Sequence, residues 1–282
     1  MALTYLSLTN DVITRMNEVA LTAATFADAR GVQIQCQNAV NESIRYINQK
    51  EFGYPFNHVT NTSTLVPGTV RYTVPTSTKH IDYNTARIKK DTDLNTSGGN
   101  LTKLDYNEYI SRGFATQEDE VETTTLDGAL TDSATTVTVA STTGFTSTGV
   151  IFILGEQISY TGITSTTFTG CTRGANSTTA ASHVTATQVA LFTNGGVPQF
   201  IVRTPDNNYL LYPLPDKQYS LVFDYYTFPG DLAAHGDITS IPDRFSPIIV
   251  DGATAFVYQY RGELDQYNTN FVRFEQGIKN VQ

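Results

Sequence analysis

Both ends of the chain carry apolar residues at helical spacing, whereas the middle is rich in Thr and Val and alternates as β-strands do. The clearest stripe lies in a segment otherwise filled with Gln, Asn, Glu and Arg; its members are Val32, Cys36, Ala39, Val40, Ile44 and Ile47. Steps of three and four place these side chains on one face of a helix. The stripe predicts an amphipathic helix of about 20 residues that ends at Phe52-Gly53-Tyr54-Pro55.

Two further stripes lie closer to the chain ends. Near the N-terminus a short helix is predicted, with Thr9-Asn10-Asp11 as its capping residues; its stripe is Leu8, Val12, Met16 and Val19. After Ile241-Pro242-Asp243, one long helix is predicted, bent at Gly252 or Gly262; its stripe is Phe245, Ile249, Phe256, Tyr260, Leu264, Tyr267, Phe271, Phe274 and Ile278. Because none of these helices can bury its stripe alone, we expect them to pack into one bundle.

The middle of the chain predicts a β-domain with an insertion. Strand-like runs fill residues 58–90 and 198–228, and helical turns are predicted at 105–112. The acidic residues Glu118, Asp119, Glu120 and Glu122 are interpreted as a solvated linker. From 123 to 190 the composition shifts to Thr, Ser, Gly and Ala with short alternating runs, which indicates a separate all-β module.

The predicted fold class is therefore α+β, with a helical bundle formed by the N- and C-terminal helices, an antiparallel β-domain and an inserted small all-β module. The expected boundaries are 1–56 for the N-terminal helices, 57–122 for the first half of the β-domain with a short helix, 123–190 for the module, 191–240 for the second half and 241–282 for the C-terminal helix.

Motifs of catalysis and ligand binding are missing from the sequence. It contains no phosphate-binding glycine loop, no nucleophile elbow and no zinc helix, and none of its four histidines has a Cys or a second His at ligand spacing. We interpret these histidines as solvated or hydrogen-bonded structural residues. Residues 91–95 begin like a calcium-binding loop, but Thr96 and Thr102 break that pattern and favour a polar turn. We expect no enzyme activity, no catalytic residue, no metal and no cofactor.

Charge and hydropathy exclude further classes. The net charge of −9 disfavours tight binding to a phosphate backbone, and no apolar run reaches the ~20 residues that span a membrane. The start lacks the pattern of a secretory signal. Cys36 and Cys171 fall in different predicted segments, so we expect no disulfide between them.

Two resemblances concern tailed bacteriophages. The order of helices and sheet, together with residues 36–51, 211–226 and 241–245, resembles the head-to-tail adaptor proteins, including the tail tubular protein A type. In the module, Gly155-Glu156-Gln157-Ile158-Ser159-Tyr160-Thr161-Gly162, residues 168–174 and residues 180–183 resemble a small β-module that recurs in phage virion proteins.

The adaptor resemblance implies a structural protein of the virion that is made in the host cytoplasm and placed at the head-tail junction. Its implied partners are the portal protein, a tail nozzle or tail tube protein, and further copies of itself in a twelve-fold ring. Viral DNA would pass through the channel without specific binding, for genome retention and ejection, and no membrane partner is implied. The terminal helix would dock onto the portal.

The candidate interaction residues are the C-terminal stripe Phe256, Tyr260, Leu264, Tyr267 and Phe271. We expect this stripe to pack against the helix that holds Val40, Ile44 and Ile47; otherwise it faces a partner or solvent. Two alternatives stay open for the whole chain. One is a tail, baseplate or fibre component, and the less favoured one is a glycan-binding module, which the absence of Trp disfavours.

Overall fold

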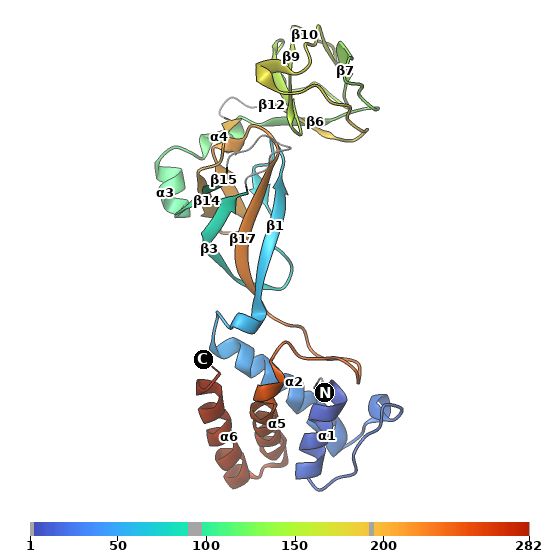
Figure 1. Ribbon diagram of the computed structural model, residues 1–282, viewed down its shortest axis with the longest axis vertical. Helices are drawn as coiled ribbons and strands as arrows, with labels where there is room; N and C mark the ends of the chain where they lie inside the picture. The colour runs from blue at the N-terminus through green and yellow to red at the C-terminus, as the bar shows by residue number, and fades with distance from the viewer. Residues whose placement is uncertain (1–2, 90–97, 192–194, 282) are drawn as a thin grey trace. The chain divides into compact units, whose positions relative to one another are not determined.

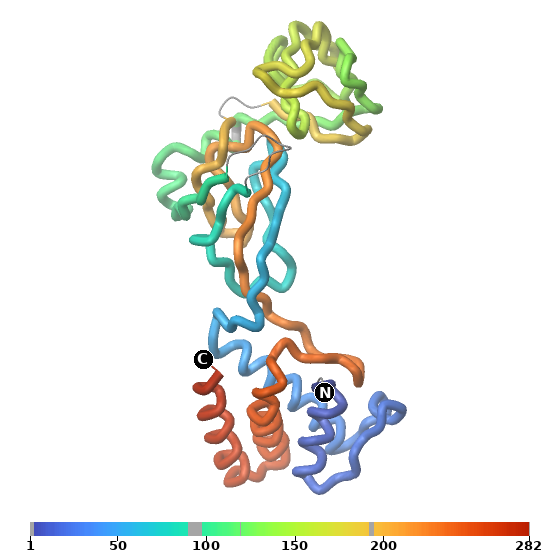
Figure 2. Tube along the Cα trace, viewed as in Figure 1, coloured from blue at the N-terminus to red at the C-terminus, as the bar shows by residue number. Residues whose placement is uncertain are grey.

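The computed structural model describes residues 3–89, 98–191 and 195–281, so the predicted turn at residues 91–95 lies outside the described residues. The chain has the α+β composition that the sequence predicts (Figure 1). It divides into two compact units. Figure 2 shows the path of the chain, coloured by residue number. The helical unit comprises residues 1–59, 77–80 and 225–282, and the β unit comprises residues 60–76 and 81–224.

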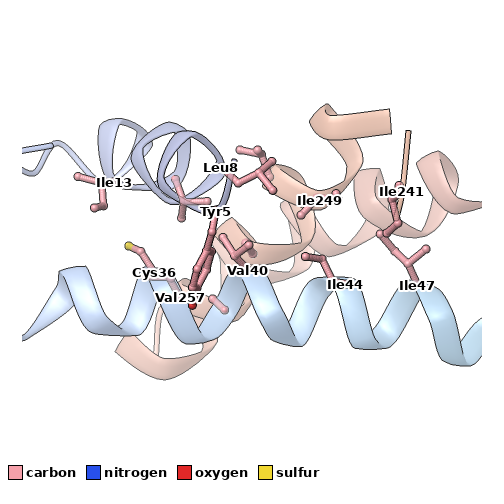
Figure 3. Close-up of a cluster of buried hydrophobic side chains, with 14 of the residues drawn as sticks. Tyr5, Leu8, Ile13, Cys36, Val40, Ile44, Ile47, Ile241, Ile249 and Val257 are labelled. Atoms are coloured by element: carbon pink, nitrogen blue, oxygen red, sulfur yellow. The ribbon is translucent and has the colours of Figure 1, made fainter. Parts of the chain in front are cut away.

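The helical unit joins helices from both chain ends around one core, as predicted. Its helices are α1 (Tyr5–Arg15), α2 (Val32–Lys50), α5 (Ser246–Arg261) and α6 (Leu264–Lys279), with the single turns Phe26–Asp28, Pro55–Asn57 and Asp243–Phe245 between them. Figure 3 shows the central cluster, to which Leu8 and Ile13 of α1, Val40 of α2 and Ile249 of α5 contribute buried side chains. The predicted stripe of the second helix is confirmed from Cys36 to Ile47.

The first helix begins earlier than its sequence indicates. Thr4, not the Thr9-Asn10-Asp11 cluster, is the N-cap, and its hydroxyl accepts a hydrogen bond from the Ser7 amide at 3.2 Å. Thr9 is buried inside the helix, and the Asn10 side chain instead binds both backbone groups of Leu21 at 2.8 Å. The predicted stripe ends too late as well, because Val19 lies beyond the end of α1.

The single long C-terminal helix of the sequence prediction is wrong. Gly262 has a φ of 77°, and its N–H bonds to the carbonyl of Gln259. A residue in this left-handed conformation ends a helix, which is why glycine is favoured there. Two helices, α5 and α6, result, and they lie side by side in the helical unit (Figure 1).

Gly252 sits where α5 crosses its neighbours. A Cβ atom at this position would lie 2.4 Å from the Ser43 hydroxyl of α2 and 2.6 Å from the Phe274 ring of α6. Gly252, Ser43 and Phe274 are all buried. The absence of a side chain at Gly252 therefore allows the three helices to approach closely.

The described residues of the β-domain form two four-stranded sheets and one two-stranded sheet. The first has the order β1-β17-β3-β4, with bounds His58–Leu65, Tyr219–Thr227, Thr78–Ile88 and Gly99–Asn100. The second has the order β2-β15-β14-β5, with bounds Arg71–Tyr72, Tyr209–Tyr212, Phe200–Arg203 and Thr102–Leu104. The predicted helical turns are α3 (Tyr106–Ser111), which Asp105 caps, and they are followed by α4 (Thr116–Asp119).

Pairing in this domain is not antiparallel throughout. β14 pairs in parallel with β5, and the two-residue strands β13 (Gly195–Gly196) and β16 (Leu214–Pro215) are also parallel. A parallel pair needs a long crossover connection, and the chain between β5 and β14 provides one because it contains the module. Glu118 is also not part of a solvated linker, since its carboxylate accepts hydrogen bonds from Arg71 at 3.0 Å and from the Tyr109 hydroxyl at 3.2 Å.

The module region has two small antiparallel sheets. One has the order β6-β12-β8-β9, with bounds Glu122–Thr125, Gln188–Leu191, Gly149–Ile153 and Glu156–Tyr160; the other has the order β10-β11-β7, with bounds Gly162–Ile163, Thr167–Thr169 and Thr136–Thr138. The first and last strands pair, with Glu122 opposite Leu191 and Thr125 opposite Gln188. A core of its own includes Val137, Ile151 and Phe168, all fully buried.

The paired ends and separate core lead to the first prediction. Replacing residues 123–190 by a short Gly-Ser bridge should leave the helical unit folded, because the chain enters and leaves the module on neighbouring strands. The measurement is the helical circular dichroism signal and its thermal midpoint. Loss of that signal in the deletion variant would contradict the insertion boundaries.

The second prediction concerns the helix crossing at Gly252. Gly252→Ala improves helix propensity by about 1 kcal/mol, but overpacking against Ser43 and Phe274 costs about 1–3 kcal/mol, so we expect a net loss of stability. Gly236→Ala is the control, because a Cβ atom there meets nothing within 4 Å. Urea denaturation compares the two variants. Equal midpoints would show that the helices around Gly252 shift to accept the methyl group without loss of stability.

Candidate functional site

The predicted interaction stripe is divided between helix packing and the surface. Phe256 and Phe271 are half-buried and surround Tyr46 of α2, with ring centroids 6.2 and 5.8 Å from the Tyr46 ring. Phe274 completes this group at 5.3 Å from Tyr46. For these residues the expected packing against the second helix is confirmed.

The polar rim of this aromatic group holds the same helices together. The Tyr46 hydroxyl donates a hydrogen bond to the Glu275 carboxylate, and the Lys50 ammonium lies 3.0 Å from that carboxylate and 4.9 Å from the centre of the Tyr46 ring. Hydrogen bonds from Tyr46 and Lys50 lower the pKa of Glu275, against an opposing effect of burial. Phe256 and Phe271 therefore serve mainly the internal packing of the helical unit.

The middle of the stripe is at the surface. Tyr260 is 69% exposed and Leu264 is 64% exposed, on either side of the turn at Gly262. Tyr267 is half-buried and stacks on Phe271 with the ring centroids 5.2 Å apart. The expectation that Tyr260 and Leu264 pack against α2 as core residues is wrong, because the chain turns at Gly262 and directs both side chains outward.

Other exposed apolar side chains lie near this turn. Val19 is 79% exposed, and the neighbouring Glu18 carboxylate lies 3.6 Å from the Arg261 guanidinium beside Gly262. The Gln33 side chain donates a hydrogen bond to the Val19 carbonyl at 2.8 Å, which fixes this loop to the start of α2. Ile34, the next residue on α2, is 41% exposed. We call Val19, Ile34, Tyr260 and Leu264 the apolar tip.

A groove adjoins the apolar tip. It has a volume of about 220 Å³ and is lined by Gln35, Asn38 and Glu42 of α2 and by Phe256 and Tyr260 of α5, among others. One wall is therefore polar and the other aromatic. Such a mixed surface suits a partner that inserts an apolar side chain and pairs its backbone or polar groups at the rim.

Sequence reasoning found half of the apolar tip. Tyr260 and Leu264 were among the predicted interaction residues, whereas Val19 was assigned to a buried stripe. Ile34 was not singled out, although it lies off the stripe that runs through Val32 and Cys36 and so belongs on another face of the helix.

A second constellation lies inside the module, at residues that carried the resemblance to virion modules. Glu156 keeps only 1% of its surface exposed and accepts hydrogen bonds from Nε and Nη2 of Arg173, both at 2.7 Å. The backbone amides of Gly174 and Ala181 also donate to it, each at 3.1 Å. Nε2 of His183 lies 2.8 Å from the same carboxylate.

This cluster is saturated with internal partners. Arg173 also donates to the carbonyls of Thr131 and Ala181, so its guanidinium joins three segments of the module. Burial acts to raise the pKa of Glu156, but hydrogen bonds from Arg173, His183 and the two amides outweigh it and hold the pKa below its usual value. The arrangement stabilises the module. It also confirms the interpretation of His183 as a hydrogen-bonded structural residue.

Some remaining observations bear on chemistry. Within the described ranges, no group of three or more His, Cys, Asp or Glu side chains is placed to hold a metal ion. Among the same residues, no helix is long and apolar enough to cross a membrane. Cys36 and Cys171 are both buried, and they are not bonded to each other.

The chain was compared with models of known protein families and with curated proteins. A family model described as SU10 adaptor protein matches residues 109–281, which is more than half of the 282 residues. The matched range begins in α3 and includes the module region, strands β14 to β17 and the two C-terminal helices. A search of curated proteins finds no match.

The third prediction concerns the pH dependence of the buried cluster. Because the folded pKa of Glu156 lies below its ordinary value of 4.5, its ionised form stabilises the fold above that pH, and this contribution is lost as the pH falls through the folded pKa. Glu156→Gln should cost about 3–5 kcal/mol at neutral pH, since it leaves Arg173 buried without its counter-ion.

The measurement is thermal unfolding of both proteins between neutral pH and about pH 3. The difference between wild type and Glu156→Gln should shrink toward the acid end, while other carboxylates affect both proteins alike. A difference that stays constant with pH would mean that folding does not shift the pKa of Glu156.

Proposed function

Because the chain belongs to the family of SU10 adaptor proteins, we propose that it is a subunit of the ring that joins the head of a tailed bacteriophage to its tail. As a phage adaptor it is a structural protein of the virion. In this proposal one side of the ring binds the portal protein and the other meets the tail nozzle or tail tube. The relation to the tail tubular protein A type, the twelve-fold symmetry and the location at the head-tail junction are parts of the same proposal.

The main support for the proposed contact with the portal protein is the apolar tip. Exposed apolar residues that gather at one place mark interaction surfaces more often than scattered ones do. Here they come from the loop after α1, from α2 and from the turn between α5 and α6, and α1, α2 and α5 share one core. A rigid support of this kind lowers the entropy that is lost when a partner binds. The adjacent groove offers a place for a partner's side chain.

The charge of the chain supports a channel through which DNA passes without binding. Each copy has a net charge of −9, so a ring of many copies would surround the DNA with excess carboxylates. Phosphates and carboxylates repel, and salt screens this repulsion only in part at short range. Such a channel retains and releases DNA without holding it at specific positions.

The fourth prediction tests the portal contact. Purified chain mixed with portal rings should give a larger complex, and the double variant Tyr260→Ser with Leu264→Ser should bind at least about 10-fold more weakly, because buried apolar anchors dominate such interfaces. Val272→Ser is the control, since Val272 is exposed on α6 but lies outside the apolar tip. Analytical ultracentrifugation measures the complex.

Two outcomes would contradict the proposal. One is no association of the intact chain with portal rings, and the other is submicromolar binding of duplex DNA at physiological salt. Either result would favour a tail, baseplate or fibre component instead. If the double variant and the control both bind as the wild type does, the ring proposal stands but the apolar tip is not the portal contact.

A further inference from the structure

The edge of the first sheet is formed by a strand without the usual protection. β1 occupies one end of the order β1-β17-β3-β4, and Figure 1 shows it beside β17. Residues 52–70, which include all of β1, contain no Lys, Arg, Asp or Glu, and β1 itself contains no Pro. Edge strands normally carry charges, prolines or bulges, because their outward backbone groups otherwise pair with another chain.

The opposite edge of the same sheet has the protection that β1 lacks. β3 carries Lys79, Asp82 and Arg87, and in the described part of this edge β4 pairs with Arg87 and Ile88 of β3. The Asp82 carboxylate accepts a hydrogen bond from the Asn84 amide at 3.1 Å, and the Asp82 carbonyl accepts one from the Thr85 hydroxyl at 2.7 Å. These contacts give Asp82 and Asn84 local partners, and the Thr85 hydroxyl also accepts a hydrogen bond from the Asp224 amide of β17 at 2.8 Å.

β1 is also held in a regular conformation on its inner side. The Tyr209 hydroxyl lies 3.3 Å from the Ser63 hydroxyl, and Leu65 is fully buried. On the other face, the Thr60 hydroxyl donates a hydrogen bond to the Asp224 carboxylate of β17 at 2.7 Å, while Thr62 and Thr64 are exposed. Among the described residues, no strand pairs with the outer edge of β1, so an incoming strand would meet a backbone that is already ordered.

Charge indicates which partner can use this edge. Copies with a net charge of −9 repel each other, so two copies approach most easily where both surfaces lack ionised groups. β1 itself supplies no Lys, Arg, Asp or Glu side chain to such a contact, and the Asp224 carboxylate of the adjoining strand β17 is already hydrogen-bonded to Thr60. Backbone pairing needs no complementary charges, and it can be repeated identically by each copy around a ring.

We propose that β1 accepts an extended segment from a second copy of this chain, so that a β-sheet continues from one subunit to the next. The inference deepens the ring proposal, because a ring places copies side by side. The contact is head-to-tail: β1 of one copy pairs with a different segment of its neighbour. The uncharged Thr62 and Thr64 side chains would lie beside the paired segment of the second copy.

The test uses the photo-cross-linking amino acid benzoylphenylalanine in place of Thr62, mixed with unsubstituted chain that carries a heavy isotope label. The mixture is irradiated in two samples, one bound to portal rings and one free at millimolar concentration, which is comparable to the effective concentration of neighbours in an assembly. Mass spectrometry then identifies the peptide that is joined to position 62.

The expected product in the portal-bound sample joins position 62 to a heavy-labelled peptide of another copy, and the same product appears, at lower yield, in the concentrated free sample. The matched control carries the cross-linker in place of Asn84, which is exposed on the protected edge, and should give no heavy-labelled product. Products confined to the same chain, or to the portal protein, would overturn the inference.

Portal binding is recorded in the same samples, so the two proposals fail separately. Bound portal without heavy-labelled product would refute the pairing of copies and leave the ring in place. No portal binding would refute the ring, and the free sample would still decide whether β1 pairs with another copy. As a second measurement, Thr62→Lys with Thr64→Lys should reduce the number of copies per portal ring, whereas Asn84→Lys should not.

Discussion

The packing of the two chain ends against each other is the interaction on which the rest of this structure depends. Leu8 and Val40 come from the first 50 residues, Ile249 and Phe274 come from the last 40, and all four are fully buried in one core. This core closes a loop of about 200 residues. The entropy of closing a loop grows only with the logarithm of its length, so the β-domain and a further module can be accommodated between the helices at little added cost.

Sequence periodicity predicted this core well because a stripe at three- and four-residue spacing has one physical meaning. Its failures came from single residues that act through the backbone or through distant partners. Gly262 could equally be read as a bend or as a helix end, and only the packing of α6 beside α5 decides between them. Thr9 has a side chain that can cap a helix, yet it is buried within α1. The N-cap of this helix is therefore Thr4, which lies before it in the sequence.

The polar residues were harder to predict for the same reason. Glu118 looked like part of a charge run, but its partner Arg71 lies 47 positions earlier in the sequence. Glu156, Arg173 and His183 were noticed as parts of a pattern, without any indication that they meet inside the module. A buried ion pair of this kind adds little net stability over apolar residues. Its hydrogen bonds form only when the segments that carry Glu156, Arg173 and His183 are all correctly folded. It can therefore select one arrangement of a module whose strands are short and rich in Thr.

Ionised groups are distributed unevenly over the chain, and this constrains how an adaptor of this charge can assemble. Between residues 123 and 190 the Lys, Arg, Asp and Glu residues are Asp127, Asp132, Glu156 and Arg173, and the last two are buried against each other. Residues 52–70 contain none, and the apolar tip contributes none. The excess of carboxylates is thus carried by the remaining surface. Electrostatic repulsion between like-charged subunits is smallest where the contact surfaces carry no charge. The charged surface then remains available to face water or DNA. In the proposed ring, one sequence would in this way combine repulsion of DNA with close association of its own copies.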